Sequence, residues 1–120
     1  MPDTPATLSA STLVHDILPR LEATESLIHT ALQERIEAAA STAERQRHTL
    51  LKQEFELEIT MIRLNLDSLM KRHAAEIRRA MSNPQDRHDA PLSLDANERV
   101  ALQSARTLYE RVRRFRPHDG

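Results

Sequence analysis

Six histidines are the residues of this sequence best suited to holding a metal ion. They are His15, His29, His48, His73, His88 and His118. No two of them are three or four residues apart, which is the spacing that places two imidazoles on one face of a helix. Glu44 and His48 do share a face, but two ligands do not complete a site. The sequence therefore predicts no metal and no cofactor.

Carboxylates and hydroxyls are the next groups that could carry out chemistry. On a helix, Glu54 and Glu58 are neighbours while Glu56 points away from them, and no apolar pocket is evident that would raise the pKa of a carboxyl group. The serines lack the strained-turn context of a nucleophile, and there is no cysteine. We expect no enzyme.

Arginines near the C-terminus form the best candidate binding surface. Arg99, Arg106 and Arg113 are seven residues apart, so a helix aligns them, and Arg114 stands beside them. This row could pair with acidic residues in the 20–60 region, with an acidic protein partner, with nucleic acid or with a membrane surface. No aromatic residues are interleaved for base stacking, and the net charge of the chain is −1. We therefore favour structural pairing and an acidic partner over nucleic acid.

The composition indicates the elements that position these residues. About half of the 120 residues are Ala, Glu, Lys, Leu or Arg, and the single glycine is the last residue. This composition is typical of long helices, and it nearly excludes a β-rich fold. We predict an all-α chain with five parts: a flexible segment at 1–11, a long helix or helical hairpin at 12–82, a linker at 83–94, a basic amphipathic helix at 95–116 and a tail at 117–120.

The path of residues 12–82 has two alternatives. Pro19 predicts a kink or the first turn of a helix. Residues 37–49 contain no large apolar side chain, and Ser41 with Glu44 has the spacing of a capping box, so the chain could turn near 38–42. Three consecutive alanines favour helix, and turns usually contain Gly or Asn. We favour a continuous rod over the hairpin.

Apolar residues in the middle of the chain fall on two helical faces. A main seam runs through Leu51, Phe55, Ile59, Ile62, Leu66, Leu69, His73 and Ile77, and a second stripe of Leu50, Leu57, Met61 and Leu64 lies opposite. Apart from His73, we predict these residues to be the core of an oligomer. His73 is either a polar residue at the end of the core or a pH-sensitive element.

The last helix carries one narrow apolar face that must dock. Its predicted docking residues are Leu94, Ala101, Ala105, Leu108, Val112 and Phe115. An acidic first half and a basic stretch at 61–83 favour antiparallel pairing of two identical chains. We predict an antiparallel homodimer in which each last helix packs on the second stripe.

These features favour a protein that functions by binding other molecules and not by catalysis. We expect a non-enzymatic helical protein–protein interaction module that acts as an oligomer, and it resembles in general type the adaptor, chaperone-like or stalk components of bacterial assemblies. The alternative is a dimeric nucleic-acid-binding accessory protein that uses the basic last helix. No apolar run is long enough to span a membrane, and a cytoplasmic location is expected.

Overall fold

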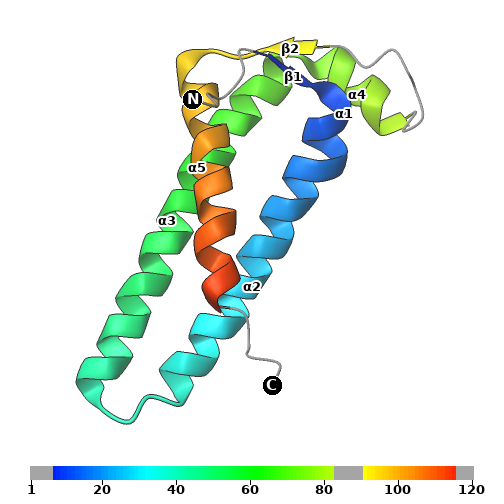
Figure 1. The fold of residues 1–120 in the computed structure, drawn as a ribbon. Helices are drawn as coiled ribbons and strands as arrows, with labels where there is room; N and C mark the ends of the chain where they lie inside the picture. The colour runs from blue at the N-terminus through cyan, green and yellow to red at the C-terminus, as the bar shows by residue number, and fades with distance from the viewer. Residues whose placement is uncertain (1–6, 83–90, 116–120) are drawn as a thin grey trace.

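The computed structural model describes residues 7–82 and 91–115, which form a mostly helical and somewhat elongated body of 54 × 29 × 28 Å (Figure 1). The prediction of a helical chain is confirmed. The elements in order are β1 (Thr7–Ser9), α1 (Ala10–Thr12), a π-helical turn (Leu13–Ile17), α2 (Leu18–Glu37), α3 (Thr42–Arg72), α4 (Ala74–Ser82), β2 (Pro91–Ser93), α5 (Ala96–Val112) and a 3₁₀ turn (Arg113–Phe115).

The first helical arm is continuous from α1 to the end of α2 despite Pro19. A proline inside a helix removes one backbone donor and crowds the preceding turn. Here the helix widens into the π-helical turn Leu13–Ile17 shortly before Pro19, which is the second residue of α2. The Tyr109 hydroxyl from α5 donates a hydrogen bond of 3.2 Å to the Ile17 carbonyl in this region. A local change of helix type thus accommodates the proline.

The favoured continuous rod is wrong, because the chain folds back as a hairpin between α2 and α3. The helix ends at Glu37, and Ala38 has φ −91° and ψ 0°. Ser41 then caps α3 by accepting a 3.1 Å hydrogen bond from the backbone N–H of Glu44. Antiparallel packing buries the apolar faces of both helices, and this burial outweighs the modest helix preference of the alanines.

A second break separates α3 from α4 at His73, whose backbone (φ −121°, ψ 38°) leaves the helical region. The helix α4 then buries Ile77 and Ala80. His15 in the first arm contacts the Ala80 carbonyl through Nε2 at 3.0 Å. The predicted long helix 12–82 is therefore three helical segments.

Two short strands join parts of the chain that are far apart in sequence. β1 and β2 pair antiparallel with Leu8 opposite Leu92, and both leucines are buried. The segment 1–11 was expected to be flexible, but residues 7–11 form β1 and the start of the first helix. Most of the predicted linker 83–94 lies outside the described residues, and its end forms β2.

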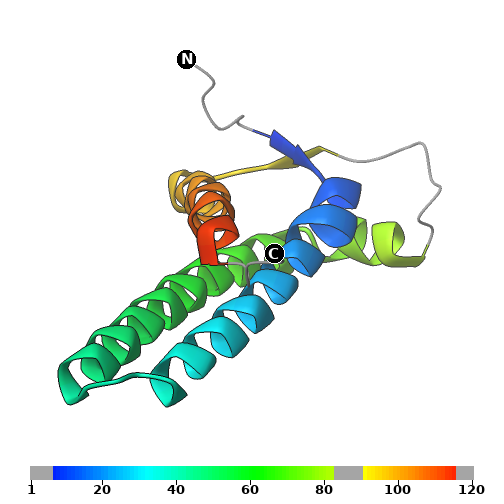
Figure 2. The ribbon, with the colours of Figure 1, turned by 60° about the horizontal axis from the view of Figure 1, so that its bottom comes forward.

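Helix α5 lies along the groove between α2 and α3 and closes the core (Figures 1 and 2). Four of its predicted docking residues are buried there: Ala101, Ala105, Leu108 and Val112. Leu94 is half-buried, Leu102 is buried as well, and the side chain of Phe115 lies outside the described part. The prediction that α5 covers the second stripe is wrong, because α5 packs against the main seam of its own chain.

Candidate interaction surface on helix α3

Helix α3 and its continuation α4 bury the main seam within a single chain. Leu51 and His73 are half-buried, and the other seam residues are buried: Phe55, Ile59, Ile62, Leu66, Leu69 and Ile77. α2 and α5 both pack against this face of α3. The seam residues assigned to an oligomer core therefore belong to the core of one chain.

The second stripe of α3 points away from that core. Its four residues, which we call the α3 stripe, are Leu50, Leu57, Met61 and Leu64, with exposed fractions of 59%, 64%, 53% and 60%. They recur at intervals of seven, four and three residues, so they form one line along the helix. Large apolar side chains in a row are unusual on a surface that only faces water.

The apolar surface extends from α3 onto α5. Val100 of α5 is 63% exposed. A shallow groove of about 370 Å³ separates the two helices and is lined by Leu57, Met61 and Val100, with Glu54, Glu58, Ile62, Asn65, Ala101 and Ser104 completing its wall. This face of the molecule therefore presents a line of exposed apolar side chains with a shallow groove beside it.

Polar residues flank the α3 stripe on both sides, and Glu54 and Glu58 beside the groove are acidic. Helical positions place Gln53 and Thr60 on one flank and Asn65 on the other. Thr60 and Asn65 donate to backbone carbonyls of their own helix at 2.9 Å and 3.1 Å.

The carboxylates near the α3 stripe are partly neutralised by their own chain. Glu56 pairs with Lys52 at 3.7 Å, and Glu58 pairs with Arg111 at 3.4 Å. Arg111 also lies 4.7 Å from the centre of the Phe55 ring. Among the residues that the structure describes, Glu54 and Asp67 have no ion pair.

The arginine row of α5 faces solvent. Arg99, Arg106, Arg113 and Arg114 are exposed, and Arg113 pairs with Glu110 of the same helix at 3.4 Å. Arg111, outside this row, pairs with Glu58 of α3 at 3.4 Å. The row itself is presented on the surface of α5.

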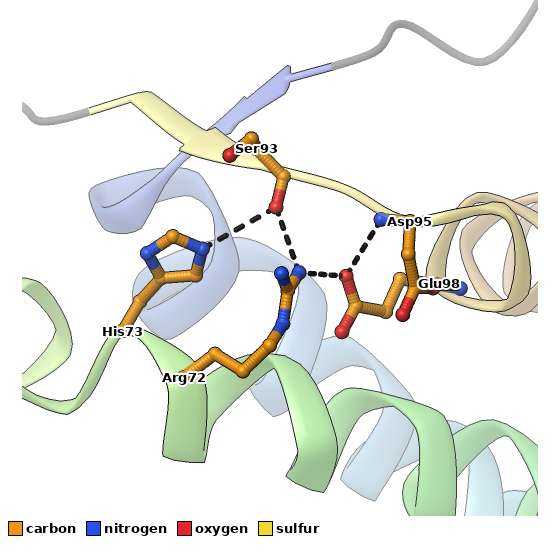
Figure 3. A network of polar contacts seen from close by, with 5 residues as sticks. All are labelled: Arg72, His73, Ser93, Asp95 and Glu98. Carbon is orange, nitrogen blue, oxygen red and sulfur yellow. Dashed lines mark hydrogen bonds and ion pairs between the residues drawn. The ribbon is translucent and has the colours of Figure 1, made fainter.

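A polar network that sequence reasoning missed fixes the start of α5 (Figure 3). Asp95 and Glu98 form a capping box at the N-terminus of α5. Glu98 accepts a 2.9 Å hydrogen bond from the Asp95 backbone and also pairs with Arg72, although its side chain is almost fully buried. Arg72 and His73 additionally contact the Ser93 carbonyl, at 2.9 Å and 3.3 Å.

Polar residues also line a groove of about 560 Å³ between α2 and the end of α5. Arg20 lies 5.4 Å from the centre of the Tyr109 ring there, and Arg113 stands at the groove's edge. Burial raises the pKa of Tyr109 above its ordinary value of 10.0, the charge of Arg20 opposes this rise, and Asp16 adds to it. Glu110 and Arg113, which both line the groove, form an ion pair at 3.4 Å.

Residues 7–82 and 91–115 contain no group of three His, Cys, Asp or Glu side chains placed to hold a metal ion. His48 pairs with Glu44 at 3.7 Å. In the same described ranges, none of the helices combines the length and the apolar character needed to cross a bilayer. Comparison with models of known protein families, with curated proteins and with solved structures finds no match.

Proposed function

We propose that this protein is a non-enzymatic helical interaction module that binds another protein surface through the α3 stripe. The observation that carries the proposal is the line of four large apolar side chains, each more than half exposed. An adaptor, chaperone-like or stalk role, as expected from the sequence, would use such a surface to hold a partner.

Burial energetics support an interacting role for the α3 stripe. The core of the single chain is already closed by α2 and α5, and more than half of each stripe side chain is still exposed. Burying a fully exposed leucine or methionine side chain contributes about 1.5–3 kcal/mol, so covering the exposed part contributes roughly half of that. Four such side chains in one line can therefore supply much of the free energy of a moderate-affinity complex.

A comparison of three forms of the full chain tests the proposal: wild type, the stripe variant Leu57→Gln/Leu64→Gln and the control Glu56→Gln/Lys71→Gln. The control changes exposed polar residues of the same helix. Self-association and retention of other proteins are measured together, and circular dichroism confirms that each form folds. We expect association in wild type and control that is lost in the stripe variant. Equal behaviour of all three forms would contradict the proposal.

A second candidate function is binding of nucleic acid through α5. The observation that favours it is the exposure of Arg99, Arg106, Arg113 and Arg114. Phosphate contacts make affinity fall steeply with salt. A gel shift with generic duplex at low salt, repeated with Arg99, Arg106 and Arg113 changed to Glu, tests this function. The other outcome is that the arginine row binds an acidic protein. In that case the chain binds that protein but does not shift the duplex.

The expected cytoplasmic location stays a prediction. Fractionation of the native cell with an antibody against the chain would test it.

A further inference from the structure

We propose that the groove between α2 and the end of α5 binds a carboxylate that is carried on a short apolar body. The groove has a volume of about 560 Å³, which falls in the range of small-molecule sites in proteins. Its walls come from residues outside the α3 stripe, so this inference is independent of the proposed function.

Thr24 supplies a buried hydroxyl in the wall of this groove. The residue lines the groove and is only 8% exposed. A threonine inside a helix can donate to the carbonyl four residues before it, as Thr49 and Thr60 of α3 do. The Thr24 hydroxyl forms no hydrogen bond of this or any other kind with the part of the chain that the structure describes. A buried hydroxyl without a partner costs free energy, so a polar group that enters the groove is stabilised there.

Arg20 and Arg113 bring positive charge to the groove, one from α2 and the other from the end of α5. Arg20 pairs with Asp16 at 3.1 Å, and Arg113 pairs with Glu110 at 3.4 Å. All four side chains are more than half exposed, so these pairs contribute little and can be exchanged for contacts with another anion. Each pair uses a single nitrogen of the guanidinium, which leaves N–H donors for the two oxygens of a carboxylate.

Apolar side chains complete the walls of the groove. Ala23, Leu27 and Val112 line it beside Tyr109, and the Arg20 guanidinium lies 5.4 Å from the centre of the Tyr109 ring. Burial raises the pKa of Tyr109, so this part of the groove is shielded from water, and attraction between opposite charges is stronger where water is excluded. A short aliphatic body packs against such walls while its carboxylate reaches an arginine.

Two sources can supply this chemistry: a free organic acid, and the C-terminus of a peptide that ends in an apolar residue. Hexanoate represents the free acid, and acetyl-Ala-Ala-Leu with a free carboxylate represents the peptide. Hexanol and hexylamine share the apolar body of hexanoate but lack the carboxylate, whereas acetate has the carboxylate without the body. All are titrated into the full chain at constant ionic strength.

Tyr109 makes binding observable, because it is the only tyrosine and the chain has no tryptophan. Its fluorescence therefore reports on this groove, and titration calorimetry provides an independent affinity. We expect saturable binding of hexanoate or the peptide, and affinity at least about tenfold lower for hexanol, hexylamine and acetate. Whichever carboxylate binds more tightly identifies the source. Absence of saturable binding by both carboxylates, or equal affinity for hexanoate and hexylamine, would overturn the proposal.

Three variants locate the carboxylate, and a fourth serves as their control. Arg20→Gln and Arg113→Gln should each weaken binding about tenfold, and Thr24→Val, which keeps the shape of the side chain, about threefold to tenfold. The control Arg114→Gln removes the same charge at an exposed position that does not line the groove, and it should change affinity less than about twofold.

Equal losses in Arg113→Gln and Arg114→Gln would show attraction by net charge alone and would overturn the proposal. Circular dichroism confirms that each variant folds. Because Arg113 is exposed, its replacement leaves the core intact, and the comparison with Arg114→Gln decides the outcome even when Thr24→Val does not fold.

Discussion

Arg72, the last residue of α3, donates a hydrogen bond to the carboxylate of Glu98, which lies buried in the first turn of α5. The two residues are 26 positions apart and belong to different helices. The same carboxylate oxygen accepts the backbone N–H of Asp95 at 2.9 Å. One contact therefore fixes both the cap of α5 and its attachment to the end of α3.

Removing the guanidinium should leave the buried carboxylate without its cation. We expect Arg72→Met to lower the free energy of unfolding by about 1.5–3 kcal/mol, since hydrogen bonds to charged groups contribute in that range. Lys71→Met, at the neighbouring exposed position, should change it by less than about 0.5 kcal/mol. Urea unfolding followed by circular dichroism measures both. Equal losses would show that the contact does not stabilise the fold.

The half-buried phenol of Tyr109 makes stability depend on pH in the alkaline range. Its pKa is raised in the folded chain, so above the ordinary value of 10.0 the unfolded chain releases a proton that the folded chain retains. The contribution of Tyr109 to the free energy of unfolding should therefore be constant below this pH and fall as the pH rises from it toward the folded pKa.

Tyr109 is the only tyrosine of the chain, so absorbance at alkaline pH reports its ionisation alone. We expect its midpoint in the native protein to lie above the midpoint in urea. Tyr109→Phe should remove the part of the alkaline stability loss that follows this titration, and it should cost about 1 kcal/mol at neutral pH through the lost hydrogen bond to Ile17. Coincident midpoints would contradict burial of the phenol.

Leu64 and Leu66 provide a matched pair on the two faces of α3. Leu66 is 1% exposed, whereas Leu64 is 60% exposed. Leu66→Ala should destabilise the chain by about 2–5 kcal/mol because it leaves a cavity in the core. Leu64→Ala, measured at a dilution where association is absent, should change stability by less than about 0.5 kcal/mol. A large loss for Leu64→Ala at such dilution would place the stripe inside the fold of one chain.

The turn between α2 and α3 depends on one side-chain cap. Ser41→Ala removes the acceptor of the Glu44 N–H and should destabilise the chain by about 1 kcal/mol. Ser68→Ala, in the interior of α3, should be neutral or slightly stabilising because alanine has the higher helix propensity. Thermal unfolding of the two variants compares them directly. A neutral Ser41→Ala would indicate that packing alone sets the turn.

Periodicity allowed the helical class and the buried face of the last helix to be predicted. Ala101, Ala105, Leu108 and Val112 repeat at helical intervals, and this signal is local. The capping box of Asp95 with Glu98 depends on an equally local spacing of three residues. Ser41 with Glu44 has the same spacing, but the helix preference of the neighbouring alanines favours a rod when tertiary packing is not considered.

Contacts between distant segments were beyond the sequence pattern. Leu8 and Leu92 pair in short strands whose three residues give too little alternation to detect. The partner of Glu98 depends on where the helix breaks at His73, and nothing local in the sequence marks that break. The pattern of α3 shows that the stripe is apolar. Its exposure, however, depends on α5 packing on the opposite face of α3, and a helical-wheel projection of α3 alone does not determine where α5 packs.

The pairing of β1 with β2 has a consequence for synthesis of the chain. Residues 7–9 are translated long before their strand partner at residues 91–93, and the helix that closes the core follows that partner. Leu8 thus remains uncovered while about 80 further residues are translated, and the inner face of the hairpin remains uncovered until α5 is made. The α2–α3 hairpin can form earlier from contacts nearer in sequence. Completion of the native fold is therefore a late event in translation, and a chain that stops before residue 91 exposes its hydrophobic interior to the quality-control machinery of the cell.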